Sequence, residues 1–288
     1  MTGRAKTTIS TLQARKRERQ RISMLTCYDY TTARLMEEAG LDSLLIGDTY
    51  AEVCLGHPTT LPVTMDELIT VAKAVRVGAP SVFLVGDMPY LSYQVCPTDA
   101  IRNAGRFMAE AGCDCVKVEV DRRHADTVAA MSAATIPVMA HLGLRPQSIH
   151  SIGGYRVQGK LARDAQVIIE DARIMEDAGA VALLLEAVPT EVAGLITGST
   201  ELPVIGCVSG PICDGQVVVM HDILGYDIGH PPKSVKVYAQ LHGILVDAFR
   251  AYSDDVRAGD FPLADKGVSM EPEELKALRA TLAETKCE

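Results

Sequence analysis

The sequence predicts a single (β/α)8 TIM barrel, and three observations favour it. Strand-like apolar runs alternate with amphipathic, helix-like stretches from about residue 23 to residue 252, with no linker between them. A length of 288 residues fits one such barrel or two smaller domains, and the chain lacks the Gly-x-Gly-x-x-Gly motif of a dinucleotide-binding fold. Four runs are continuously apolar, as in parallel strands buried on both faces, and they lie at 44–47, 82–86, 115–118 and 181–185.

The expected strands define the extent of the barrel. They begin near residues 24, 44, 82, 115, 136, 181 and 203. An eighth strand is weakly marked at 222–226. We therefore expect a barrel domain at 1–264, which includes an N-terminal helical lead-in, and a C-terminal helical extension at 265–288. The charged helix expected at 273–286 would pack on a neighbour or be partly disordered.

The helices between the strands have recognisable starting signals. Thr64 followed by Glu67 forms a capping box that opens a helix to about Val77. Pro97 opens a second helix, which ends near Gly112. Two longer helices are expected at 163–179 and 233–251.

Composition excludes several classes of function. The net charge is −9 with an isoelectric point near 5.3, which argues against non-specific binding to nucleic acid or to an anionic membrane surface. No apolar run approaches the roughly 20 residues that a membrane helix needs, and the basic N-terminus has no apolar signal core. The eight cysteines show no regular zinc-binding spacing. They are interpreted as reduced thiols of a cytoplasmic protein.

Four carboxylates each follow an apolar, strand-like run. They are Asp48, Asp87, Glu119 and Glu186. In a barrel of this type the carboxyl ends of the strands form the active site. Buried acids are costly without a compensating partner, and several aimed at one end of a barrel would repel each other unless a cation lay between them. The pattern therefore predicts a metal-assisted site whose hard oxygen donors suit Mg²⁺.

Two further polar residues belong to the same set of strand ends. Lys117 lies two residues before Glu119, so both side chains point to one face of the strand, and His141 ends the next strand. Each residue alone has another explanation. An Asp after a strand often caps a helix, and His141 could be a hydrogen-bonded core histidine. Lys117 could extend outward, and Glu186 could be a surface acid. The predicted active site would be absent only if all these explanations held at once.

Two glycine-containing segments have open interpretations. The stretch from Gly206 to Gly215 could bind an anion through backbone N–H groups or form an ordinary turn. Gly153 and Gly154 before Tyr155 could belong to a lid or to a flexible loop.

An ordered series of short segments carries a family resemblance. The segments are TCYDY at 26–30, GD at 47–48, TLPVT at 60–64, GDMPY at 86–90, VKVE at 116–119, HLGL at 141–144, PQS at 146–148, GGYRVQG at 153–159, LEAVP at 185–189 and DGQ at 214–216. With them the chain resembles the ketopantoate hydroxymethyltransferase family from residue 9 to about residue 264. The resemblance implies a barrel of the phosphoenolpyruvate mutase/ketopantoate hydroxymethyltransferase type.

The resemblance also implies a reaction and roles for residues. The family transfers a hydroxymethyl group from 5,10-methylenetetrahydrofolate to a 2-oxo acid, 2-oxoisovalerate, through a metal-bound enolate, in pantothenate biosynthesis. By resemblance, Asp48, Asp87 and Glu119 surround Mg²⁺. Glu186 is the general base, and Lys117 and His141 assist the bound oxo acid. The implied substrate contacts are Asp48, Thr49, Asp87 and Lys117. The family also implies a homo-oligomer, a decamer of pentameric rings.

Several neighbours of these residues depart from the usual family pattern. Tyr50 and Glu52 add bulk and charge after Thr49, where the family usually has Ser-x-Gly. The other departures are Val120 and Asp121 in place of Gly-Gly, Arg145 in place of Thr, and Cys207, Val208 and Ser209 in place of Ile-Gly-Ala. These changes predict a divergent paralogue with a reshaped acyl or folate pocket and an unusual 2-oxo acid as substrate. Two alternatives stay open, a Mg²⁺-dependent carbon–carbon lyase or mutase that needs no folate, and a non-catalytic relative.

Overall fold

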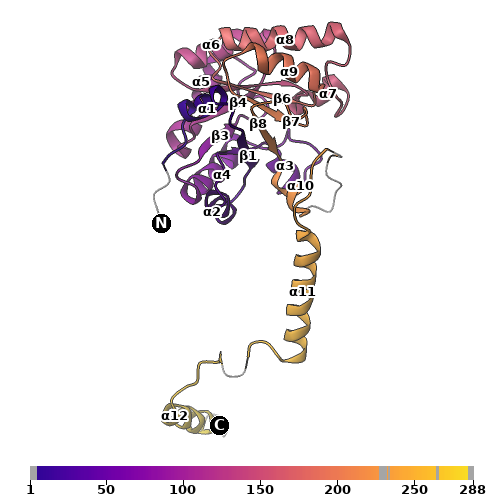
Figure 1. Cartoon of the computed structure of the whole chain (residues 1–288). Helices are drawn as coiled ribbons and strands as arrows, with labels where there is room; N and C mark the ends of the chain where they lie inside the picture. The colour runs from indigo at the N-terminus through magenta and orange to yellow at the C-terminus, as the bar shows by residue number, and fades with distance from the viewer. Residues whose placement is uncertain (1–4, 227–231, 233, 264–265, 285–288) are drawn as a thin grey trace. The chain divides into compact units, whose positions relative to one another are not determined.

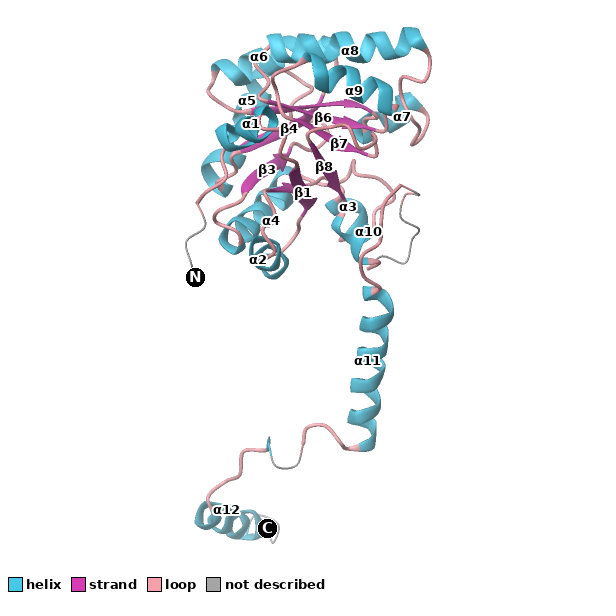
Figure 2. Cartoon of the chain, in the orientation of Figure 1, coloured by secondary structure: helices cyan, strands magenta, loops and turns pink. Residues whose placement is uncertain are grey.

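The computed structural model describes residues 5–226, 232, 234–263 and 266–284. It divides into two compact units, Met1–Ala239 and Gln240–Glu288. The first unit contains all eight strands of a closed parallel barrel, with helices around it (Figures 1 and 2). The strands are β1 (Ile22–Thr26), β2 (Ser43–Ile46), β3 (Phe83–Asp87), β4 (Cys115–Glu119), β5 (Val138–Gly143), β6 (Ala182–Glu186), β7 (Val204–Cys207) and β8 (Gly215–Val218). The predicted (β/α)8 barrel is confirmed.

The eighth strand was predicted in the wrong place. It is β8, which pairs with β1 from Ile22↔Gly215 to Leu25↔Val218 and so closes the barrel. The segment 222–226 instead lies in α10 (Met220–Leu224) and the turn after it. β8 is short and begins with a glycine, so its sequence looks like a loop. That glycine is required, because a Cβ on Gly215 would be too close to the Ile22 carbonyl oxygen and the Ile205 side chain.

The helices of the first unit mostly follow the expected pattern. They are α1 (Ile9–Arg17), α2 (Tyr30–Glu38), α3 (Tyr50–Val53), α4 (Met65–Gly78), α5 (Pro97–Ala111), α6 (Ala125–Ala133), α7 (Ile149–Ile152), α8 (Ala162–Asp177), α9 (Thr190–Ser199) and α10, with short 3₁₀ turns η1 (Arg122–His124) and η2 (Pro146–Ser148). The capping box at α4 forms as predicted. Thr64 Oγ1 accepts from the Glu67 N–H at 3.3 Å, and the Glu67 carboxylate accepts from the Thr64 N–H at 2.8 Å.

Apolar side chains form two layers on either side of the strands. One cluster fills the barrel interior and includes Leu12 of α1, Phe83, Met139 and Leu184. The other lies between the strands and the surrounding helices. Side chains alternate between the two faces along a strand, so residues two apart point to the same side. Asp87 lies two residues after the interior residue Val85, and Glu186 lies two after Leu184, so both point inward. The polar ends of β3 to β6 are therefore interior positions at the carboxyl end of the barrel.

The second unit contains α11 (Leu241–Ala258) and α12 (Pro272–Glu284). The helix predicted at 233–251 begins only at Leu241, and Lys233 lies outside the described residues, as do residues 285 and 286 of the predicted 273–286 helix. The compact barrel unit ends at Ala239, and the domain boundary at 264 stays a prediction. Among the described residues, no helix combines the length and the apolar character needed to cross a bilayer.

Candidate active site

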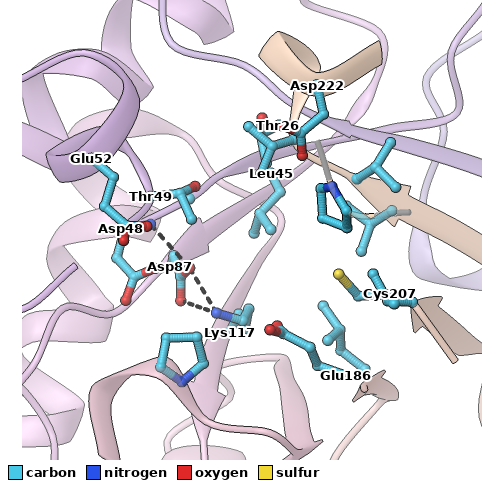
Figure 3. A pocket seen from close by; sticks show the side chains of 18 of the residues that line it. Thr26, Leu45, Asp48, Thr49, Glu52, Asp87, Lys117, Glu186, Cys207 and Asp222 are labelled. Atoms are coloured by element: carbon cyan, nitrogen blue, oxygen red, sulfur yellow. Dashed lines mark hydrogen bonds and ion pairs between the residues drawn. The ribbon is translucent and has the colours of Figure 1, made fainter. Parts of the chain in front are cut away.

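Three charged side chains meet at the ends of β2, β3 and β4. The Lys117 ammonium donates to both carboxylate oxygens of Asp87 at 2.7 Å, and the backbone N–H of Asp48 donates to Asp87 Oδ2 at 3.1 Å (Figure 3). All three residues are buried. Burial raises the pKa of Asp87 to about 7, although the charge of Lys117 opposes the rise. For Lys117, burial alone would lower the pKa, but the charges of Asp87 and Asp48 raise it overall, so it stays protonated.

A glutamine and a tyrosine hold two of the acids in place. Gln147 Nε2 donates to Asp48 Oδ2 at 2.9 Å, and the Gln147 backbone N–H donates to Glu119 Oε2 at 2.9 Å. The Tyr93 hydroxyl donates to Gln147 Oε1 at 2.8 Å and accepts from the Glu119 N–H at 2.9 Å. Neither Gln147 nor Tyr93 was predicted as a site residue. Gln147 lies in the segment 146–148, which carries the family resemblance, and this was the one sequence feature that could have identified it as a site residue.

His141 lies between two carboxylates. Its Nε2 is 3.4 Å from Glu186 Oε2, and its Nδ1 is 3.8 Å from Glu119 Oε1. Burial, followed by the charges of Lys117 and Arg145, lowers the His141 pKa well below 6.5, so the ring is neutral. Burial raises the pKa of Glu119 well above its usual value, with further contributions from Asp48 and Asp87 against the opposing charge of Lys117.

Glu186 ends β6 and has a strongly perturbed acidity. Its side chain is 21% exposed, which leaves it open to a small ligand. Burial raises its pKa to about 8; Lys117 lowers it, and Asp48 and Asp87 add to the rise. The neighbouring Gly143 has φ +92°, and a Cβ there would collide with the Glu186 carbonyl oxygen. Glycine at this point therefore permits the close approach of β5 to the end of β6.

Some of these residues border a cavity of about 260 Å³, which Glu119 and His141 do not line. Asp48, Asp87, Lys117 and Glu186 form its polar part, and Thr49 lines it beside Asp48 (Figure 3). Its apolar part comes from β2, β6, β7 and β8 and from the residue after β7, and consists of Leu45, Leu184, Cys207, Val208, Val217 and Val218. A small molecule with one polar end and one apolar end fits such a cavity.

The sequence departures do not all reach this cavity, and Tyr50 and Ser209 line neither it nor the second cavity described below. Glu52, Cys207 and Val208 line the cavity, and the Tyr155 hydroxyl donates to Glu52 Oε1 at 3.1 Å. Tyr155 also lines the cavity, so the segment after Gly154 reaches the site.

Three other departures form a separate cluster. Arg145 Nη1 donates to Asp121 Oδ2 at 2.6 Å, and Arg123 pairs with the same carboxylate. Val120, Asp121 and Arg145 line a second cavity rather than the one beside Glu186. The prediction was a reshaped acyl or folate pocket, and only Glu52, Cys207 and Val208 line the cavity beside Glu186.

The donor set is compatible with Mg²⁺. Asp48, Asp87 and Glu119 supply hard carboxylate oxygens, and Glu119 Oε1 is buried with no hydrogen-bond partner among the described residues. In that same part of the chain, no group of three or more His, Cys, Asp or Glu side chains forms a ready metal-binding cluster. Mg²⁺ does not require one, since it usually keeps several waters and binds one or two carboxylates plus oxygens of the substrate.

Known structures share the fold at low sequence identity. A phosphoenolpyruvate phosphomutase from Streptomyces platensis subsp. rosaceus matches with a TM-score of 0.61 and 15% identity, covering 97% of this chain and 98% of that one. A 2,3-dimethylmalate lyase, described as a member of the PEP mutase/isocitrate lyase superfamily, matches with a TM-score of 0.58 and 18% identity, covering 98% and 99%. These likenesses support the barrel type and nothing more specific.

Sequence relatives are much closer. A 3-methyl-2-oxobutanoate hydroxymethyltransferase from Syntrophomonas wolfei subsp. wolfei is 44% identical over 274 residues, which cover 95% of this chain and 99% of that one. The enzyme of the same name from Koribacter versatilis is 45% identical over 274 residues, covering 95% and 92%. The sequence model of the family described as ketopantoate hydroxymethyltransferase matches residues 6–264. The chain therefore belongs to the ketopantoate hydroxymethyltransferase family.

Proposed function

We propose that this protein transfers a hydroxymethyl group from 5,10-methylenetetrahydrofolate to 2-oxoisovalerate and so forms ketopantoate. The observation that carries the proposal is a perturbed carboxyl, Glu186, facing a small cavity that has a charged part and an apolar wall. The relatives that are 44% and 45% identical are named for 3-methyl-2-oxobutanoate, which is 2-oxoisovalerate, and this favours the ordinary substrate over an unusual one.

Glu186 is proposed as the general base. The carbon next to the ketone of a 2-oxo acid is weakly acidic, and its proton would move to the Glu186 carboxylate. A base works best when its pKa lies near the working pH, and burial brings the Glu186 pKa to about 8. His141 is neutral and carries one N–H, which can orient either Glu186 or Glu119.

Lys117 is proposed to stabilise the negative charge that develops on the substrate oxygen. An ammonium group has three N–H donors, and two of them point to the Asp87 oxygens at 2.7 Å. The third remains for the enolate oxygen. The carbanionic carbon then forms a bond to the one-carbon unit of the folate. Water replaces the folate nitrogen on that carbon, so its oxygen becomes the hydroxyl group of the product, its proton goes to the nitrogen, and tetrahydrofolate leaves. Because Lys117 and Asp87 are both buried, their charges act in a weakly screened environment.

Asp48, Asp87 and Glu119 are the residues proposed to hold Mg²⁺. When bound there, Mg²⁺ would supply Lewis-acid polarisation of the ketone. A carboxylate has about four lone-pair positions, so Asp87 can accept from Lys117 and still serve as a ligand. Gln147 restrains Asp48 and Glu119 through 2.9 Å hydrogen bonds, which keeps both acids in place as ligands.

The test uses the purified full-length protein, Mg²⁺ and 2-oxoisovalerate in D₂O. Without folate, we expect NMR to show loss of the proton signal at the carbon beside the ketone. Adding 5,10-methylenetetrahydrofolate should then produce ketopantoate, detected by mass spectrometry. Proton exchange without any ketopantoate would instead favour the folate-independent lyase or mutase class. Absence of exchange would contradict the enzymatic proposal.

The proposal also covers the assembly of the protein and its location in the cell. We propose a cytoplasmic homo-oligomer, and specifically a decamer of pentameric rings as in the family. Exposed apolar side chains on α11, among them Ile244, Phe249 and Tyr252, support a surface that is covered in an assembly. The free state of the seven cysteines that the structure describes supports a reducing compartment. Light scattering of the purified protein would test the subunit number.

A further inference from the structure

We propose that Val208 sets the upper size limit for the alkyl group of the 2-oxo acid, an inference that rests on the proposed function. Val208 has φ +54°, in the left-handed region of the backbone map. For a β-branched residue this conformation is a steric outlier, because the branched side chain crowds the backbone. Such strain is retained mainly where the surroundings enforce it, and it often marks a functional site.

The loop around Val208 is held on both sides. The buried Ser209 hydroxyl donates to the Leu185 carbonyl oxygen at 2.8 Å and accepts from the Val188 N–H at 3.3 Å. Further along, Gln216 Nε2 donates to the Gly210 carbonyl oxygen at 3.0 Å. These contacts tie the β7–β8 loop to the end of β6 and to β8. The backbone at Val208 therefore cannot relax without breaking them.

Packing in the protein core does not explain why residue 208 is a valine. The residue is 38% exposed, so its apolar side chain gains little from burial in the protein interior. It lines the cavity beside Cys207. The strained valine thus contributes a branched apolar surface to the site, where a glycine would adopt the same backbone conformation without strain.

The position of Val208 relative to Glu186 indicates which part of the substrate the valine side chain contacts. Cys207 is the β7 partner of Glu186 in the barrel register, and Val208 follows it directly. In the proposed reaction Glu186 takes a proton from the carbon beside the ketone, and that same carbon carries the alkyl groups. The end of β7 therefore borders those groups. An apolar wall at this point discriminates by about 10- to 200-fold per methylene group.

The test compares 3-methyl-2-oxobutanoate with 3-methyl-2-oxopentanoate, which has one methylene more. Proton exchange in D₂O with Mg²⁺ would be measured for both acids with wild type, V208A, V208G and R19G. Arg19 is the matched control, because it also has a positive φ (+57°) but is exposed and does not line the cavity. V208A removes most of the side chain but keeps a Cβ at positive φ and so part of the backbone strain, whereas V208G removes the whole side chain and the strain.

We expect the relative kcat/KM for the larger acid to rise about tenfold or more in both Val208 variants and to stay unchanged in R19G. The melting temperature should rise in V208G and R19G, where glycine relieves strain, but not in V208A. If V208A folds poorly, V208G still carries the test. An unchanged preference in the Val208 variants, with an active wild type, overturns the inference alone. A wild type that exchanges neither acid overturns the proposed function and the inference with it.

Discussion

Replacing Glu186 with Gln should abolish most of the proton exchange. Glutamine keeps the shape of the side chain, including the approach to His141 Nε2 at 3.4 Å, but cannot accept a proton. Removal of a general base typically costs about 10²- to 10⁴-fold in rate. At about 1.4 kcal/mol per tenfold, this corresponds to about 3–5 kcal/mol of transition-state stabilisation.

The same carboxyl determines the expected pH dependence. Burial raises the Glu186 pKa to about 8, so without Mg²⁺ only about one-tenth of it is ionised at pH 7. The base acts as the carboxylate, and its ionised fraction increases with pH. Exchange should therefore rise about tenfold between pH 7 and pH 9. Mg²⁺ adds positive charge nearby, which favours the carboxylate and should move the midpoint to lower pH.

The assay is NMR-detected deuterium exchange of 2-oxoisovalerate across this pH range, with and without Mg²⁺. E52Q is the matched control, since Glu52 is a carboxylate that lines the same cavity but follows its strand rather than ending it. We expect E52Q to retain exchange. An E186Q variant that keeps the wild-type rate and pH profile would refute the assignment of Glu186 as the base.

Three further perturbations test the surrounding residues. K117M should lower the free energy of unfolding by about 3–5 kcal/mol, because it leaves buried Asp87 without its partner. Burial already raises the Asp87 pKa to about 7, so the stability lost in K117M should be smaller at low pH, where the Asp87 carboxyl is protonated. Urea unfolding of wild type and K117M at pH 5.5 and pH 8 checks this difference. Y155F removes the 3.1 Å hydrogen bond to Glu52 and should raise KM for the oxo acid about 2- to 12-fold; an unchanged KM would count against a role of Tyr155 in closing the site. D48N should remove most of the Mg²⁺-dependent rise in melting temperature seen with wild type, and an equal rise would show that Asp48 is not a ligand.

The success and the failures of the fold prediction have local causes. Strands such as β3 and β6 were recognisable because both faces are buried, which produces continuous apolar runs. β8 was missed because it has four residues and starts with a glycine. The helix predicted from residue 233 starts only at Leu241, because the preceding segment makes a tertiary contact, in which the Tyr238 N–H donates to the Ile223 carbonyl oxygen at 2.7 Å.

The positions of the predicted site residues also have local causes. Glu119 and His141 were selected as expected strand ends and Lys117 because it shares a strand face with Glu119, and parallel strands bring their carboxyl ends to one edge. Gln147 and Tyr93 come from the segments that follow β5 and β3. Their hydrogen bonds to the acids depend on how those segments fold over the barrel, and no spacing in the chain encodes that path.

The sequence by itself determined the barrel, the inward-facing acids and lysine, and the family, because apolar runs, strand ends and short motifs are local properties of the chain. Only the tertiary structure decided which of the unusual neighbours reach the cavity. Val208 and Glu52 line it, whereas Asp121 and Arg145 pair with each other beside a second cavity. That division depends on how the segments after β2, β4, β5 and β7 fold, and at Val208 the backbone is held by long-range hydrogen bonds of Ser209 and Gln216. The positive φ of Val208 follows from this tertiary arrangement and cannot be read from the sequence.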